Sequence, residues 1–187
     1  MKWFKFYEDL HGSFRIYWRA YGGWSALVRS PYLFLAIVFS CLMFPYWEEA
    51  WWQVALNTIS NLLGFSIGGY AIWLAIGDQK FTDKLAGPGR DNEKPSPYIT
   101  VNATFVHFVF VQLLVMLTAL LFQAWIPEDN GSIYIQIGTV TWFSSAIGYT
   151  LFLYALFMAL AAAFTVFRVS RWYDHFIATK ETNGENY

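Results

Sequence analysis

The sequence is poor in charge. Only 13% of its 187 residues are Asp, Glu, Lys or Arg, whereas about a quarter are charged in a soluble domain. The formal net charge is −1, so no basic excess attracts nucleic acid, and direct nucleic-acid binding is not expected. Hydrophobic residues make up 57% and aromatic residues 21%. This composition excludes a disordered chain and argues against an ordinary soluble domain, which would have to hide so many rings from water.

Groups that carry chemistry are also scarce. Cys41 is the single cysteine, which excludes an internal disulfide and any cysteine-cluster metal site. The apolar segments hold no paired carboxylates, and the sequence contains no HExxH motif. We therefore expect no enzyme activity, no bound metal and no cofactor.

Four long apolar runs organise the chain: 31–47, 51–77, 98–125 and 133–167. None contains Asp, Glu, Lys or Arg, as expected in lipid, where a charge at the bilayer centre costs several kcal/mol. The runs are continuous and do not alternate as barrel strands do. The sequence therefore predicts an all-α polytopic membrane protein with four transmembrane helices in a domain covering residues 30–172.

The basic residues predict the orientation. All twelve Lys and Arg residues lie before the first run, between the second and third, or after the fourth. The two turns on the opposite side carry only acidic charges: Glu48, Glu49, Glu128 and Asp129. The positive-inside rule then places both termini in the cytoplasm. We expect the protein to lie in the plasma (inner) membrane. The loop 78–97 and the tail 173–187 are expected to be cytoplasmic, with an irregular loop centre and a tail that frays beyond Arg171.

The first 29 residues predict an amphipathic helix in the inner headgroup layer. Large apolar side chains recur on one helical face at steps of three and four: Trp3, Tyr7, Leu10, Phe14, Tyr17, Tyr21, Trp24 and Val28. Gly12 and the pair Gly22 and Gly23 are expected to break the helix. The alternative is a cytosolic helix packed on a partner or on the inner ends of the spans.

Aromatic and basic residues are expected to anchor the chain at the two interfaces. The inner anchors are Trp3, Trp18, Trp24, Arg168, Arg171 and Trp172. The outer anchors are Tyr46, Trp47, Trp51, Trp52 and Trp125.

The second run carries a stripe of amides and small residues at helical spacing: Gln53, Asn57, Asn61, Gly64 and Gly68. Small residues let helices approach closely, and amides then hydrogen-bond across the contact. The stripe indicates helix packing, within one subunit or between subunits, or the polar wall of a water-filled path. A second stripe, with Ser145, Gly148 and Ala155 at its centre, indicates a packing groove in the fourth run.

His107 is the one histidine inside a span. An intramembrane ionisable residue is a candidate sensor or gate. The alternative is a neutral imidazole that is hydrogen-bonded to a neighbouring helix. A metal site would need further ligands, and His11 and His175 lie in the cytoplasmic segments.

Three classes of function remain. The first is an oligomeric channel-like or membrane-perturbing effector, because four helices in one subunit do not easily enclose an aqueous path. The second is a membrane-anchored sensor or scaffold that docks a cytosolic protein through loop 78–97 and the termini. A secondary transporter is the weakest, since charged intramembrane residues and an inverted repeat are lacking.

The size, four spans, internal termini and aromatic-rich helices resemble the small four-span membrane subunits of bacterial anti-phage defence systems, such as the membrane component of Kiwa. The resemblance implies an oligomer that senses infection at the inner membrane or disturbs that membrane, together with a cytosolic partner. It assigns no role to any single residue.

Overall fold

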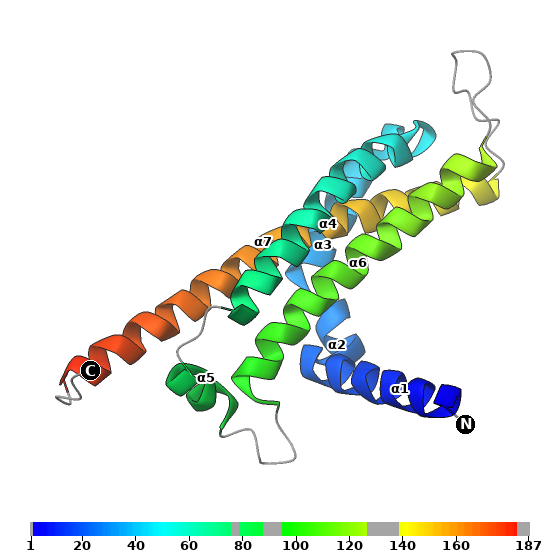
Figure 1. Ribbon diagram of the computed structural model, residues 1–187. Helices are drawn as coiled ribbons and strands as arrows, with labels where there is room; N and C mark the ends of the chain where they lie inside the picture. Colours follow the sequence, from blue (N-terminus) through cyan, green and yellow to red (C-terminus); the bar gives the residue numbers. More distant parts are fainter. Residues whose placement is uncertain (1, 76–78, 88–94, 127–138, 183–187) are drawn as a thin grey trace.

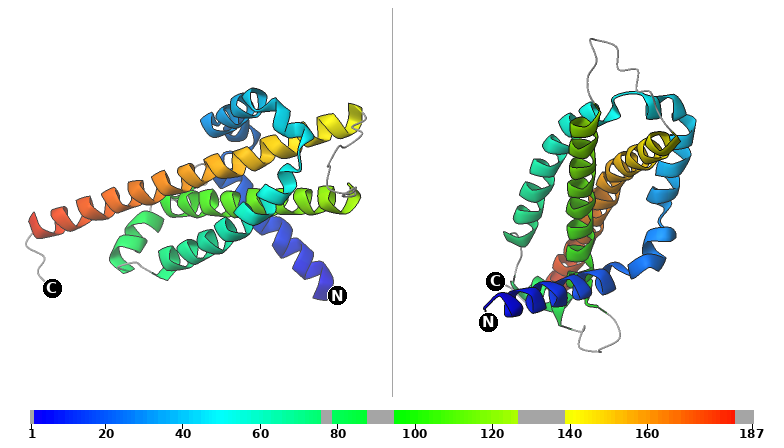
Figure 2. Two further views of the ribbon diagram at one scale, coloured as in Figure 1. Left: turned by 90° about the horizontal axis from the view of Figure 1, so that it is seen from above. Right: turned by 90° about the vertical axis from the view of Figure 1, so that its right-hand side faces the viewer.

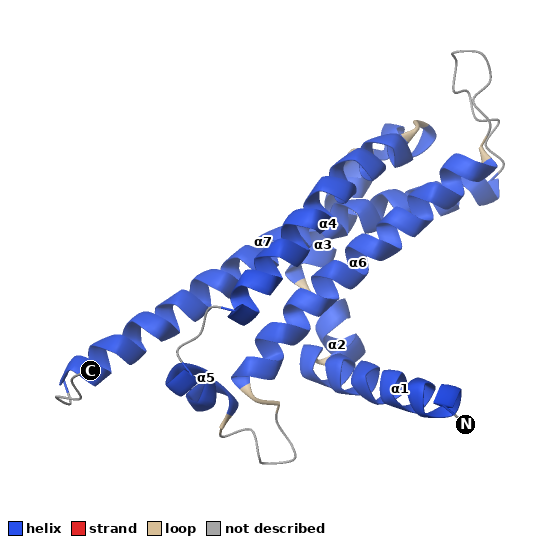
Figure 3. Cartoon of the chain, viewed as in Figure 1, coloured by secondary structure: helices blue, strands red, loops and turns tan. Residues whose placement is uncertain are grey.

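A computed structural model describes residues 2–75, 79–87, 95–126 and 139–182, and this part of the chain is helical and contains no strand (Figure 3). The α-helices are α1 (Lys2–Tyr21), α2 (Gly23–Val28), α3 (Pro31–Leu42), α4 (Trp51–Ala75), α5 (Gln79–Ala86), α6 (Pro97–Trp125) and α7 (Thr139–Thr182). A 3₁₀-helix, η1 (Phe44–Glu48), follows α3. The predicted all-α class is therefore confirmed.

The long helices α4, α6 and α7 form a bundle, and α3 packs along α7 (Figure 1). Two of them, α6 and α7, are individually long and apolar enough to cross a membrane. A third crossing is added if α4 and α5 together count as one bent span, while α3 is a shorter apolar helix. The fold is thus that of a helical protein compatible with a membrane location.

The core lies where α4, α6 and α7 meet. Ile59, Val115, Tyr154 and Met158 are among its fully buried side chains. The three helices can share this core because each of them is apolar on nearly every side. Many large apolar residues remain exposed on the outside of the same helices, as lipid-facing positions would be.

The predicted packing groove on α7 is filled by Trp51 from α4. The Trp51 indole N–H donates a 2.8 Å hydrogen bond to the Ser145 hydroxyl. A Cβ at Gly148 would collide with the Trp51 ring, so only glycine fits there. Trp51 and Trp52 are each 2% exposed. Both rings are therefore packed inside the bundle: Trp51 fills the space above Gly148, and Trp52 stacks on Phe122 of α6.

The N-terminal helix α1 lies transverse to the long helices and packs against α6 (Figure 2). It ends at Gly22 and Gly23, whose φ angles of 104° and 63° lie in the left-handed region that favours glycine. The predicted break at Gly12 is wrong, because α1 continues through that residue. A single glycine costs a helix only about 1 kcal/mol relative to alanine.

Several boundaries differ from those expected. The first apolar run leaves α-helical geometry after Leu42, because Pro45 in η1 has no N–H to continue the ladder. The loop 78–97 contains α5, whose Phe81 is buried against Tyr173 and Phe176 of α7. α7 continues as a helix to Thr182, so the tail does not fray at Arg171. Residues 133–138 of the fourth run lie outside the described residues.

Candidate functional site

His107 lies at the centre of a cluster that joins three helices. The side chain, on α6, is only 3% exposed. Its Nδ1 lies 2.7 Å from the Tyr17 hydroxyl of α1, and its Nε2 lies 3.0 Å from the Tyr154 hydroxyl of α7. A neutral imidazole offers one donor and one acceptor, and a phenol can act as either. Both ring nitrogens are therefore satisfied by tyrosines.

Tyr21 completes this cluster, which we call the His107–tyrosine cluster (Tyr17, Tyr21, His107 and Tyr154). The Tyr21 ring stacks on the imidazole with ring centroids 3.8 Å apart and planes inclined by 18°. Its hydroxyl lies 3.3 Å from the hydroxyl of Tyr154. Two residues one turn apart on α1 thus hold this helix against the bundle.

The α1 members of the cluster stay protonated at neutral pH. Burial raises the pKa of the Tyr17 phenol to about 12, and the neighbouring Tyr21 adds to that rise. Burial also raises the pKa of Tyr21, against a smaller opposing effect of its hydrogen bond with Tyr154. Each phenol therefore keeps a proton for hydrogen bonding.

Among the side chains that the structure describes, no three His, Cys, Asp or Glu side chains gather closely enough to hold an ion. His107 has tyrosine neighbours rather than acidic ones. The arrangement is suited to holding α1, α6 and α7 together.

The amide and glycine stripe of α4 faces away from the bundle. Asn57, Asn61, Gly64 and Gly68 are all exposed, and Gln53 is half-buried. A Cβ added at Gly64, Gly68 or Gly69 would meet nothing within 4 Å. The Asn61 amide donates a 2.9 Å hydrogen bond to the Asn57 carbonyl on its own helix. Gly64 and Gly68 therefore make no close helix contact within the described subunit.

The opposite face of α4 holds a buried polar pair with α6. The Gln112 amide, which is fully buried, donates a 3.0 Å hydrogen bond to the Ser66 hydroxyl. The Ser66 hydroxyl in turn donates to the Leu62 carbonyl. The Gln112 Oε1 has no partner within the described part of the chain. Such an acceptor is costly in an apolar interior.

The inner anchors fall into two groups. Trp18 stacks with Phe14 and Tyr21 and meets Trp24 edge to face, with ring centroids 5.1 Å apart. Trp24 is 71% exposed. On α7, the Arg168 guanidinium lies 5.6 Å from the Trp172 ring, and Arg171 is exposed. Trp3 falls within α1, but its side chain lies outside the described residues.

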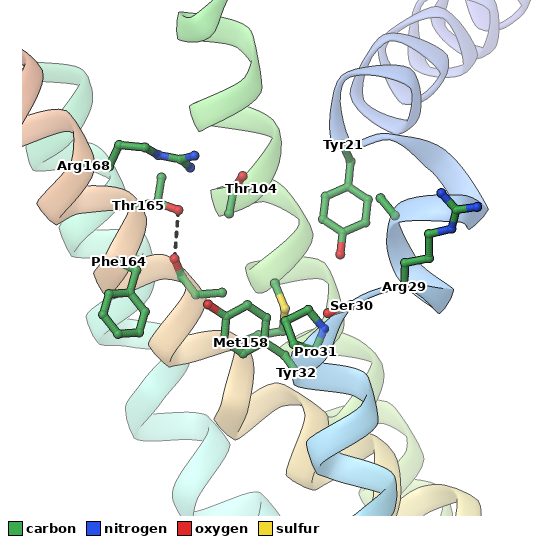
Figure 4. A pocket seen from close by; sticks show the side chains of 12 residues that line it. Tyr21, Arg29, Ser30, Pro31, Tyr32, Thr104, Met158, Phe164, Thr165 and Arg168 are labelled. Carbon is green, nitrogen blue, oxygen red and sulfur yellow. Dashed lines mark hydrogen bonds between the residues drawn. The ribbon is translucent and has the colours of Figure 1, made fainter.

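A cavity opens beside the His107–tyrosine cluster, between α2, the start of α3, α6 and α7 (Figure 4). Its volume is about 560 Å³, within the range of about 300–1,000 Å³ typical of ligand pockets. Arg29 and Arg168 stand on opposite sides of the opening, with Tyr21 and Thr104 between them (Figure 4). Cationic, hydroxyl and apolar side chains therefore line this cavity.

Sequence reasoning singled out His107 but not its partners. Tyr17 and Tyr21 lie on the predicted apolar face of the N-terminal helix, so the sequence indicated that they face away from water. Tyr154 lies among apolar residues of α7, and no local pattern distinguishes it from a packing residue. The pairing depends on how α1 crosses α6, which periodicity does not specify.

No family model, curated protein or solved structure matches this chain.

Proposed function

We propose that this protein is an oligomeric inner-membrane protein that acts as a channel-like or membrane-perturbing effector, with both termini in the cytoplasm. The subunits associate through the outward face of α4. The amides near its outer end border a polar path, and the glycines below them allow close helix contact.

The contrast between the two small-residue stripes supports this proposal most strongly. The stripe on α7 is used inside the subunit, where Trp51 fills the space above Gly148. The stripe on α4 is open, with Asn57 and Asn61 exposed and free space around Gly64 and Gly68. Amides facing hydrocarbon lose hydrogen bonds that water or a second subunit supplies. A second copy, or water held between copies, therefore satisfies this face.

The position of α1 supports its assignment to a headgroup layer. It lies transverse to the long helices, as a helix in the headgroup layer lies relative to membrane spans (Figure 2). From its contact at His107, α6 continues to Trp125, a length of about 27 Å at about 1.5 Å per residue. That length is close to the roughly 30 Å of a hydrocarbon core.

A role in anti-phage defence is part of the proposal and depends on the resemblance to the four-span defence subunits. Loss of protection against infection in an Asn61→Leu variant with normal expression supports that role. A native chain that gives no protection in a host where its neighbouring genes are intact contradicts it.

Disulfide crosslinking tests the α4 interface. In a Cys41→Ser background, Gly64→Cys is expected to give covalent dimers in membranes after mild oxidation. Leu114→Cys on α6 is the matched control, because it is exposed and lies two residues beyond Gln112, as Gly64 lies two residues before Ser66. Dimers with Leu114→Cys but none with Gly64→Cys overturn the proposed interface.

Thiol accessibility and conductance test the polar path. Asn57→Cys and Asn61→Cys are expected to react with small soluble thiol reagents from the outer side, and Asn61→Leu to abolish conductance in planar bilayers. Protection of both cysteines, with an oligomer that does not conduct, contradicts the conduit while leaving the interface intact.

A scaffold that docks a cytosolic effector is the second candidate. The observation that favours it is the contact of α5 with the far end of α7, where Phe81 meets Tyr173 and Phe176. Lys84 also lies 5.5 Å from the Phe176 ring. This contact holds α5 against α7 and leaves Lys84 exposed on a surface that a partner can use. Deleting residues 87–94 is expected to release a co-purifying protein, and a chain that purifies alone and conducts ions argues against this candidate.

A further inference from the structure

A pocket lies between α5 and the C-terminal part of α7, and we call it the α5–α7 pocket. Its walls are aromatic, with Trp172 and Phe176 from α7 and Phe81 from α5. Trp172 and Phe176 are one turn apart on the same face of α7. The volume of the pocket is about 310 Å³, at the lower end of the range of about 300–1,000 Å³ typical of ligand pockets. The proposed channel makes no use of this pocket.

Neighbouring side chains restrain the aromatic walls. Phe81 is 6% exposed and meets the Phe176 ring with ring centroids 5.5 Å apart. The Arg168 guanidinium lies 5.6 Å from the Trp172 ring, and Arg168 is not among the described residues that line the pocket. The walls are therefore in place without a ligand, as in most small-molecule sites.

Polar side chains are found at the opening of the pocket, where Lys84, His175 and Thr179 are all exposed. The Lys84 ammonium lies 5.5 Å from the Phe176 ring. The Thr179 hydroxyl donates a 2.8 Å hydrogen bond to the His175 carbonyl, so its oxygen can still accept one. No acidic side chain occurs among the lining residues that the structure describes. The opening therefore favours an anion.

The pocket is open to water in the proposed orientation. The His107–tyrosine cluster joins α7 to α1 at Tyr154. Trp172 lies five turns further along α7, about 27 Å at about 1.5 Å per residue. With α1 in the headgroup layer, the pocket is on the cytosolic side of that layer. A water-soluble ligand can therefore enter it.

The shape and chemistry of the walls favour a planar ring. A nucleobase stacked on an aromatic side chain binds roughly tenfold more tightly, whereas an aliphatic chain gains only from the area it buries. The pocket covers two turns of α7, from Trp172 to Thr179, which is short for an acyl chain. A specific protein partner needs about 1,000 Å² of contact, and α5 has only eight residues.

We infer that the α5–α7 pocket binds a purine nucleoside monophosphate from the cytosol. The base lies among the three aromatic walls, and the single phosphate lies at Lys84. The inference depends on the proposed orientation but not on oligomerisation or conduction. α5 begins four residues after the end of α4, which carries the proposed subunit interface. A nucleotide that fastens α5 to α7 therefore also restrains the inner end of α4.

Equilibrium dialysis of the full chain, in nanodiscs of phosphatidylcholine, against radiolabelled AMP tests the site. The native chain is expected to bind one AMP. Trp172→Leu is expected to weaken binding about tenfold, and Lys84→Gln about fivefold, the equivalent of about 1.4 and about 1 kcal/mol. Because Lys84 is exposed, its replacement leaves the fold intact. A native chain that binds no AMP at millimolar concentration overturns the inference.

Trp24→Leu and Arg171→Gln are the matched controls for the aromatic and the cationic contact. Trp24 is 71% exposed, Arg171 is exposed, and neither lines the pocket. Both variants are expected to bind AMP as the native chain does. Equal weakening in Arg171→Gln and Lys84→Gln shows general attraction between charges and overturns the site.

Competition identifies the chemistry of the ligand. Adenosine and inorganic phosphate each make one of the two contacts, so each is expected to displace AMP more weakly than unlabelled AMP does. Octanoate, an aliphatic anion, is expected not to displace it. Displacement by octanoate or by phosphate as effective as that by AMP overturns the assignment to a nucleotide.

Amide hydrogen exchange locates the site. Exchange in α5 is expected to slow when AMP binds, and slowing confined to other helices overturns the placement. A co-purifying protein that Lys84→Gln releases, from a chain that binds no AMP, shows a protein interface instead and overturns the inference. Loss of the α4 crosslink with intact AMP binding contradicts the proposed function alone.

Discussion

Tyr17 and His107 are 90 positions apart in the chain, yet the Tyr17 hydroxyl and the His107 Nδ1 are joined by a hydrogen bond of 2.7 Å. This contact links α1 to the interior of the bundle. Its partner on the other ring nitrogen is Tyr154. The imidazole therefore connects α1 to α7 through two hydrogen bonds.

Tyr17→Phe is expected to loosen α1 without unfolding the bundle. The variant keeps the ring but leaves Nδ1 without a partner, which costs about 1–3 kcal/mol for a buried polar atom. Amide hydrogen exchange is expected to accelerate in α1 and to remain slow in the centres of α6 and α7. Tyr7→Phe, at an exposed position on the same helix, is the control. Unchanged exchange in α1 of Tyr17→Phe contradicts a role for the cluster in docking.

Alkaline pH is expected to detach α1. The pKa of Tyr17 is raised from 10.0 to about 12 in the folded protein, so folding favours the protonated phenol. The stability from this shift is complete below pH 10 and is lost as the pH rises toward about 12. Labelling of Ala20→Cys, buried on α1, in a Cys41→Ser background measures the detachment. Adding Tyr17→Phe is expected to shift the transition, and an identical pH profile contradicts the assignment to Tyr17.

Alanine is expected to destabilise the subunit at Gly148 but not at Gly64. A Cβ at Gly148 collides with the Trp51 ring, and overpacking of this kind costs about 1–3 kcal/mol. A Cβ at Gly64 meets nothing within 4 Å, so Gly64→Ala leaves the subunit stable. Unfolding in mixed micelles with increasing denaturing detergent measures both. Equal destabilisation by the two substitutions contradicts the outward direction of the α4 stripe.

The sequence predicted features that follow from hydrophobicity, such as the all-α class and the long apolar helices. Lipid excludes charged residues from each spanning helix separately, so each apolar run can be recognised in the sequence by itself. The break at Gly22 and Gly23 was also readable, because two adjacent glycines permit positive φ angles.

The sequence could not predict which side chains meet. Trp51 has the position and chemistry of an interfacial anchor, and only its approach to Gly148 makes it a core residue. The two small-residue stripes also look alike in sequence, although one is filled and the other is open. These differences depend on the rotation of each helix about its axis. In apolar surroundings that rotation is set by packing and not by a hydrophobic face.

Gln112 and Ser66 form one buried contact, but replacing Gln112 and replacing Ser66 are expected to affect the stability of the bundle differently. Gln112→Met is close in volume and removes the acceptor Oε1, which has no partner among the described residues. The Ser66 hydroxyl still donates to the Leu62 carbonyl. This substitution is therefore expected to leave stability unchanged or to raise it by about 1 kcal/mol.

Ser66→Ala, by contrast, leaves the entire Gln112 amide buried without a partner and is expected to destabilise the bundle by about 1–3 kcal/mol. Unfolding in mixed micelles compares the two variants directly. If Gln112→Met destabilises as much as Ser66→Ala, then Oε1 has a partner such as an internal water. In that case the contact between α4 and α6 is a hydrated polar site, and the polar path passes through the bundle rather than along the outer face of α4.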